Sequence, residues 1–353
     1  MDAAEALLRS AVRAGVEVCF ANPGTTEMGL VRALDEVSEM RAVLGLFEGV
    51  CTGAADGYGR MRGKPALTLL HLGPGLANGL ANLHNARRAN APVVNLVGDH
   101  ASWHLAADAP LTSDIESFAR PVSGWFRHAR AAGTAPRDLV EAVAAAGSAP
   151  GAVATLVLPT DVQEGEASPC EPLTARAPAA VSADRLASAR EALSADGAAL
   201  LLGSSALSAA GLAAAGRIAA ATGARLIAET FTARAERGAA LPRATRLPYF
   251  PEPALAMLEP FRRLLLFGSR SPVAFFGYTG LPSSLIPESC RAIPVAAPGD
   301  DAVAALLELA EAFPAAPAAR SEPRPQAPVG DLTPESLALA VCAVQPDGAI
   351  VVD

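Results

Sequence analysis

Glu48 is the first residue of this chain whose surroundings suggest chemistry. It lies between an apolar run, residues 42–47, and a stretch rich in glycine and alanine. Downstream, a second apolar run at 66–70 is followed by His71 and then by Gly73-Pro74-Gly75. We predict that both runs are buried strands, whose ends bring together a carboxylate, an imidazole and a glycine turn. Carboxylates and imidazoles are the side chains that proton transfer uses, so these residues predict a site.

The segments that must position these residues alternate between helical and strand patterns. Apolar positions at helical spacing predict a helix over residues 3–14. A further helix is expected from about Asn78, whose amide either faces a ligand or caps that helix. Strand candidates fall at 16–20, 42–47, 66–70, 92–97 and 153–158. Strands separated by helix-length segments predict a doubly wound α/β domain with a parallel sheet.

Four motifs in the first hundred residues resemble, in order and spacing, the pyrimidine-binding domain of thiamine-diphosphate enzymes. The resemblance is to the group of acetolactate synthase large subunits and benzoylformate decarboxylase. It covers residues 1–165 well and the rest more loosely. The motifs are Phe20 to Glu27, Phe47-Glu48-Gly49 with Ala54 to Arg60, Gly73-Pro74-Gly75 with Asn78, and Ala91 to Asp99.

The resemblance implies a role for each matching residue. Glu48 matches the carboxylate that shares a proton with N1′ of the cofactor's pyrimidine. His71 aligns with an active-site histidine of benzoylformate decarboxylase, and Thr25 with its substrate-contacting serine. These three are the expected catalytic residues. The expected cofactor-binding residues are Asn22, Pro23, Gly24, Gly75 and Asn78. The implied activity is that of a lyase or transferase, decarboxylating or joining 2-keto acids.

Two departures from the family pattern limit this expectation. Acetolactate synthases carry a glutamine-containing segment where this chain reads Asp108 to Thr112, which makes acetolactate formation doubtful. The family's Gly-Asp-Gly motif, which holds the diphosphate and Mg²⁺, does not occur. We therefore expect no metal ligands in this chain, a diphosphate-binding domain that is essentially absent, and inactivity without it. In the family two subunits share each site, so a homo-oligomer, a dimer or a tetramer, is also implied.

Composition shifts divide the chain into five expected regions. Repeated short apolar runs ending in glycine or polar residues predict a second parallel α/β domain, the central domain. Proline-rich stretches mark two linkers. The expected regions are a pyrimidine-binding domain at 1–165, a linker at 166–182, the central domain at 183–313, a second linker at 314–330 and the start of a truncated third domain at 331–353. In the last region, we expect a helix capped by Thr333 and a strand at 349–353.

Two other functions stay open at this stage. The glycines of Gly73-Pro74-Gly75, with Asp99 ending the next strand, partly imitate a dinucleotide fingerprint. However, the third glycine falls at 79 instead of 78, so a nicotinamide or flavin oxidoreductase is the weaker interpretation. FAD is possible in the central domain but has no motif there. The chain could instead be a non-catalytic scaffold subunit that retains the fold.

Composition and charge exclude other classes of protein. The net charge is −8 among 353 residues, and no basic run is longer than an Arg-Arg pair, which argues against nucleic-acid binding. No apolar stretch approaches the length of a membrane span. The five cysteines show no metal-like or paired spacing, so we expect reduced thiols in a cytoplasmic protein. A small metabolite, such as a 2-keto acid, is the expected partner.

Overall fold

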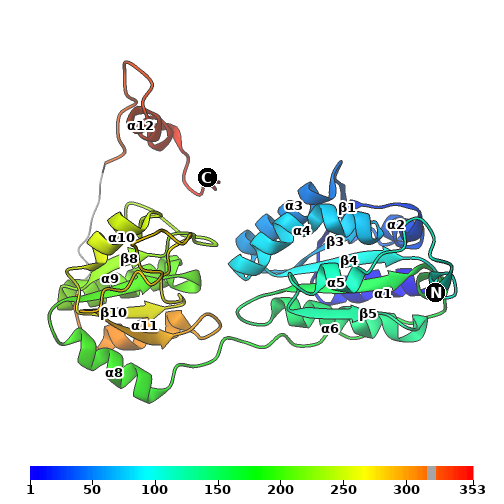
Figure 1. The fold of residues 1–353 in the computed structure, drawn as a ribbon, viewed down its shortest axis with the longest axis horizontal. Coiled ribbons are helices and arrows are strands. Elements are labelled where there is room, and N and C mark those ends of the chain that lie inside the picture. The colour runs from blue at the N-terminus through cyan, green and yellow to red at the C-terminus, as the bar shows by residue number, and fades with distance from the viewer. Residues whose placement is uncertain (316–322, 353) are drawn as a thin grey trace.

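A six-stranded parallel sheet forms the first half of the molecule (Figure 1). The computed structural model describes residues 1–315 and 323–352. The strand order is β2-β1-β3-β4-β6-β5. The strands are β1 (Val18–Asn22), β2 (Arg41–Leu44), β3 (Ala66–Leu70), β4 (Val93–Asp99), β5 (Trp125–His128) and β6 (Val153–Pro159).

Helices cover both faces of this sheet, as the alternating pattern predicted. One face packs against α1 (Ala3–Arg13), α2 (Met28–Glu36), α6 (Ala135–Gly147) and α7 (Thr160–Glu164). The other face packs against α3 (Glu48–Arg62), α4 (Leu72–Ala89) and α5 (Ile115–Ala119). Because β3 and β4 are covered on both sides, every residue in them is buried, which explains their continuous apolar runs.

The strand expectations are met unevenly. The strand predicted at 66–70 is confirmed by β3. Strand β4 runs from 93 to 99 instead of 92 to 97, β6 ends one residue after the predicted 158, and β1 lies two residues later than the predicted 16–20. The prediction that 42–47 is a buried strand is wrong. Only Arg41–Leu44 is a strand, at the edge of the sheet, and Leu44 is 70% exposed. An edge strand has one neighbour, so apolar side chains on it need not be covered.

A second parallel sheet follows an extended segment and has the order β11-β10-β7-β8-β9 (Figure 1). Its presence confirms the expectation of a second parallel α/β domain. Its strands are β7 (Ala198–Leu202), β8 (Arg225–Ala228), β9 (Thr245–Arg246), β10 (Arg263–Phe267) and β11 (Arg291–Ala296). Its helices are α8 (Ala183–Leu193), α9 (Ala209–Thr222) and α11 (Ala302–Ala312) on one face and α10 (Pro251–Leu258) on the other.

The last described segment carries one helix, α12 (Pro334–Val344), which begins where the sequence predicted. The Thr333 hydroxyl accepts a hydrogen bond from the Ser336 amide at 3.1 Å. The prediction of a strand at 349–353 is wrong for residues 349–352, which form no strand. Residue 353 lies outside the described residues. The linker predicted at 314–330 lies partly outside them too.

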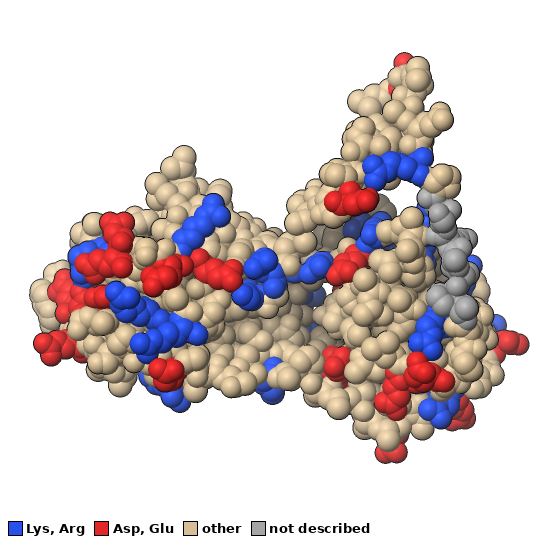
Figure 2. Space-filling model, turned by 180° about the vertical axis from the view of Figure 1, so that it is seen from behind, with Lys and Arg blue, Asp and Glu red and all other residues tan. Residues whose placement is uncertain are grey.

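The surface of the molecule carries both signs of charge. Figure 2 shows acidic and basic side chains interspersed over both halves of the face in view. Over residues 1–315 and 323–352, no helix combines the length and the apolar character needed to cross a membrane.

Leu83 provides a test of the core on the α4 side of the first sheet. Its side chain is 0% exposed. Leu83→Ala should therefore lower the free energy of unfolding of this half by about 2–5 kcal/mol, because it leaves a cavity. Leu46→Ala is the matched control, since Leu46 is 91% exposed, and should change it by less than about 0.5 kcal/mol. Urea denaturation followed by circular dichroism measures both, and equal effects would contradict this packing.

Candidate functional site

The strand order of the first sheet marks where a ligand can bind. Its order reverses between β1 and β3, which are hydrogen-bonded neighbours. In open parallel sheets, ligands bind outside the carboxyl ends of the strands at such a reversal. Pro23 and Gly24 follow β1 there, and His71 follows β3. The fold thus brings together residues that are far apart in the sequence.

Glu48 lies beside this point, as the first residue of α3, and its surface is 9% exposed. The Asn78 side-chain nitrogen donates a hydrogen bond to Glu48 Oε2 at 3.0 Å. A Cβ atom placed on Gly75 would lie 3.2 Å from Glu48 Oε1 and 3.3 Å from the His71 Cβ. Gly75 therefore lets the Glu48 carboxylate and the His71 side chain lie close to the same point of the backbone. A larger residue at this position would crowd both of them.

The local structure around Gly75 differs from the expected turn. Helix α4 begins at Leu72, so Gly73-Pro74-Gly75 forms its first turn, and Asn78 lies within the helix instead of capping it. Proline fits the first turn of a helix because the N–H groups there need no partner within the helix. The expected close approach at Gly75 is confirmed, while the expected tight turn and helix start are wrong.

His71 is held from the β1 side. Its Nδ1 atom lies 2.8 Å from Glu27 Oε2 and 3.4 Å from the Thr26 hydroxyl. A Cβ atom on Gly24 would overlap the His71 ring, so only glycine fits at this position. Thr25 begins the short 3-10 turn η1 (Thr25–Glu27) and is exposed to solvent.

Asn22 is engaged within the protein. Its side-chain nitrogen donates to the Gly45 carbonyl at 2.7 Å, which ties the end of β1 to the loop before α3. That loop carries Glu48 to the site. Asn22 therefore has a structural contact in addition to the binding role that the resemblance implies.

Two buried carboxylates at this edge of the sheet were not among the predicted site residues. Glu27 is 0% exposed and Asp99, at the end of β4, is 4% exposed. Burial raises the pKa of Asp99, and the charge of Glu27 adds to the effect, while the His100 amide and the His128 ring oppose it. Burial also lowers the pKa of His128, although Asp99 partly offsets this. No sequence motif marks His128, whereas Glu27 stood in a matched motif without an assigned role.

The site residues fit the pyrimidine half of thiamine diphosphate. An aminopyrimidine ring needs a hydrogen-bonding carboxylate with part of its surface exposed, and Glu48, 9% exposed with one oxygen bonded to Asn78, meets this requirement. Within residues 1–315 and 323–352, no group of three or more His, Cys, Asp or Glu side chains could hold a metal ion.

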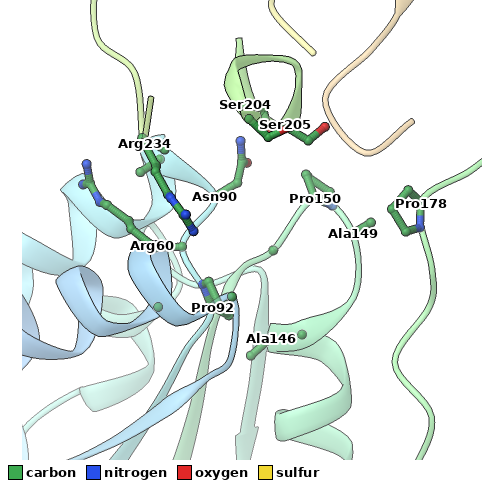
Figure 3. A pocket seen from close by; sticks show the side chains of 18 of the residues that line it. Arg60, Asn90, Pro92, Ala146, Ala149, Pro150, Pro178, Ser204, Ser205 and Arg234 are labelled. Carbon is green, nitrogen blue, oxygen red and sulfur yellow. The ribbon is translucent and has the colours of Figure 1, made fainter. Parts of the chain in front are cut away.

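A separate cavity lies between the first and the second α/β domain (Figure 3). It measures about 560 Å³, and the first domain lines it with Arg60, Asn90 and Pro92, the second with Ser204 and Arg234. Asn90 and Pro92 precede β4, so the cavity faces the opposite edge of the sheet from Glu48. None of the predicted site residues lines it.

The second domain has its own acidic residue at a strand end. Its sheet has the strand order of dinucleotide-binding folds, with the reversal between β7 and β10. Glu229 follows β8, and its carboxylate fills the space beside Gly203, where a Cβ atom would lie 2.7 Å from it. Burial raises the pKa of Glu229 from 4.5 to about 7, with the Ser204 amide and Arg270 opposing.

Comparison with known proteins agrees with the geometry of the first domain. A family described as thiamine pyrophosphate enzyme, N-terminal TPP binding domain, matches residues 1–118. A Mycobacterium tuberculosis protein, provisionally named acetolactate synthase large subunit IlvX, is 50% identical over 355 residues, spanning 100% of this chain and 68% of that protein. Benzoylformate decarboxylase of Pseudomonas aeruginosa is 32% identical over 150 residues, 42% of this chain and 28% of that enzyme.

Two solved structures share the fold. One is a provisionally described thiamin diphosphate-dependent enzyme from Mycobacterium smegmatis. It matches with a TM-score of 0.84 at 23% sequence identity, and the match covers 99% of this chain and 71% of that one. The other is the 4-hydroxybenzoylformate decarboxylase of Rhodococcus jostii, with a TM-score of 0.76 at 24% identity, covering 94% and 65%.

Glu229 predicts a dependence of stability on pH. Because its folded-state pKa is raised, the unfolded state loses the proton first, and stability falls as pH rises from about 4.5 through about 7. Glu229→Gln should abolish this loss and stabilise the second domain at pH 8 by roughly 2–3 kcal/mol relative to the wild type. The difference should vanish near pH 4.

Urea titrations at pH 4 and pH 8 measure the effect. Glu252→Gln, on the exposed side of α10, is the control and should change neither value by more than about 0.5 kcal/mol. A stability difference between Glu229→Gln and the wild type that is the same at both pH values would contradict a buried, titrating carboxyl group.

Proposed function

The chain belongs to the family of thiamine-diphosphate-dependent enzymes, and on that basis we propose that it acts in decarboxylation or carboligation of a 2-keto acid. Residues 1–165 would form the pyrimidine-binding domain and residues 183–313 the central domain. The reaction would make the protein a lyase or a transferase.

The observation that carries this proposal is the position of Glu48. Its carboxylate is held by Asn78, is largely buried, and lies close to the backbone at Gly75. In the proposed complex, Glu48 holds a proton that it shares with N1′ of the aminopyrimidine, with one carboxylate oxygen already fixed by the Asn78 amide. Thiamine diphosphate, when bound, supplies a nucleophilic carbon and accepts the electrons released by loss of carbon dioxide. Proton exchange of this kind contributes about 10²–10⁴-fold to rate.

His71 and Thr25 would face the 2-keto acid. A Cβ atom on Gly75 would lie close to both Glu48 Oε1 and the His71 Cβ, so an acid or base is available near the Glu48 carboxylate. Thr25 is exposed at the end of β1 and offers a hydroxyl to a substrate carboxylate. Asn22, Pro23 and Gly24 would form the wall between them.

The ligands of the diphosphate and Mg²⁺ would come from outside these residues. No Gly-Asp-Gly segment occurs in the 353 residues, and the chain spans 68% of the length of IlvX. Both phosphate and metal contribute to cofactor affinity, so residues 1–353 alone should bind thiamine diphosphate weakly and be inactive. We infer that the active form is a cytoplasmic dimer or tetramer. The same missing motif favours the second candidate, a non-catalytic scaffold subunit.

Glu48→Gln tests the central role of this residue. In an assembly that supplies the diphosphate site, exchange of the cofactor's C2 hydrogen for deuterium should slow by about 10²-fold or more, because a carboxamide cannot share the N1′ proton. Rapid-quench proton NMR measures the exchange. Glu39→Gln, an exposed control, should leave it unchanged. Near-normal exchange in Glu48→Gln would refute the assignment, and no turnover of any keto acid by the wild-type assembly would support the scaffold function.

Gly75→Ala tests whether the backbone beside Glu48 must lack a side chain. The new methyl group would press on both the carboxylate and the His71 Cβ, so the dissociation constant of thiamine diphosphate should rise about tenfold, or roughly 1.4 kcal/mol. Gly57→Ala in α3 is the matched control, since nothing lies within 4 Å of its added methyl group. Isothermal titration calorimetry measures both constants, and unchanged affinity in Gly75→Ala would contradict a ligand at this position.

A further inference from the structure

Glu27 is a fully buried carboxylate that the proposed reaction leaves without a role. Its exposure is 0%, and it accepts hydrogen bonds from the Gly24 amide at 2.7 Å and the Thr26 hydroxyl at 2.6 Å. The third contact is His71 Nδ1, at 2.8 Å. Burying an ionised carboxylate costs several kcal/mol unless partners compensate it, so a buried group with three partners is a built arrangement.

Two glycines make room for this arrangement. A Cβ atom on Gly98, within β4, would overlap the Glu27 carboxylate, and one on Gly24, after β1, would overlap the His71 ring. The contact between Glu27 and His71 therefore requires glycine at two positions, one in β4 and one after β1. If Glu27 only capped the η1 turn, neither glycine would be needed to bring the His71 ring into contact with it.

The hydrogen-bond pattern determines which ring nitrogen of His71 carries the proton. An ionised carboxylate accepts hydrogen bonds and cannot donate them. Because Glu27 Oε2 already accepts the Gly24 N–H, the contact with Nδ1 is satisfied when Nδ1 donates. In the neutral ring, the other nitrogen, Nε2, is then unprotonated. Within the described residues, both ring contacts of His71 use Nδ1, and the side chain remains 23% exposed.

The other charged and titratable groups near His71 lie on different elements. Glu48, on α3, lies close to Gly75, as the His71 Cβ also does. Asp99, at the end of β4, lies close enough to Glu27 for their charges to interact. Asp99 is in turn contacted by the His100 amide at 2.8 Å and by His128 Nε2 at 3.5 Å. Glu27 is the carboxylate in direct contact with the His71 ring.

We propose that Glu27 is a positioning residue that fixes His71 in its Nδ1–H tautomer and leaves Nε2 free to exchange a proton with the substrate. The tautomer of a histidine is set by the hydrogen bond that its other nitrogen makes, and a carboxylate on Nδ1 leaves Nε2 to exchange protons with a ligand. The part of Glu27 in the reaction rests on the proposed function, whereas the tautomer of His71 does not.

Nitrogen-15 NMR of the histidine-labelled full chain tests the tautomer directly. Above the titration range of the ring, long-range proton–nitrogen correlations should show His71 protonated on Nδ1, with His71→Asn identifying its signals. Glu27→Ala should shift His71 toward Nε2–H, while Glu27→Gln, whose carbonyl oxygen can accept the same bond, should retain Nδ1–H. The His84 signals, from an exposed ring on α4, should not change in any variant.

The wild-type spectrum alone can overturn the proposal, so it does not depend on whether Glu27→Ala folds. An Nε2–H signal for wild-type His71, or an unchanged Nδ1–H signal in folded Glu27→Ala, would refute it. In an active assembly, Glu27→Ala should lower kcat by on the order of 10²-fold with little change in KM, and Glu27→Gln should recover most of the loss. If Glu48→Gln leaves C2 exchange unchanged while His71 shows the expected Nδ1–H signals, the proposed thiamine-dependent function is refuted, and the positioning of His71 by Glu27 is retained.

Discussion

The structure of the site depends on one steric constraint. At the carboxyl edge of the first sheet, acidic side chains must pack directly against the backbone of glycine residues. Gly24, Gly75 and Gly98 come from three segments, and each leaves space that Glu48, His71 or Glu27 uses. A buried carboxylate is stable only with donors close by. Glycine permits that closeness, so the acids, their donors and the space for a ligand are parts of one arrangement.

This arrangement gives the two glutamates different surroundings. Glu48 accepts a hydrogen bond from the Asn78 amide on one oxygen and keeps 9% of its surface exposed, which leaves its second oxygen for the proposed ligand. Glu27 is closed off on all sides and contacts only protein, which suits a group that acts through a neighbour. The reversal of strand order between β1 and β3 brings both to the same edge. The second domain repeats the theme at Glu229, away from this site.

Sequence reasoning predicted what strong patterns determine and missed what tertiary context determines. The run at 66–70 and the capped helix after Thr333 are local signals, and both are confirmed. The run at 42–47 was misjudged because apolar composition does not reveal that a strand lies at an edge. Strand β5 was not predicted, since Trp125–His128 is short and half polar. Glu27 was overlooked because a glutamate three residues after a glycine also fits an ordinary turn cap.

The most direct test of the central claim is a crystal structure of the active assembly with thiamine diphosphate and Mg²⁺ bound. The account predicts that the aminopyrimidine N1′ lies at about 2.6–3.0 Å from a carboxylate oxygen of Glu48, with Gly75 against the ring. A cofactor seated elsewhere, with the Glu48 carboxylate turned toward solvent or bonded only to Asn78, would contradict it.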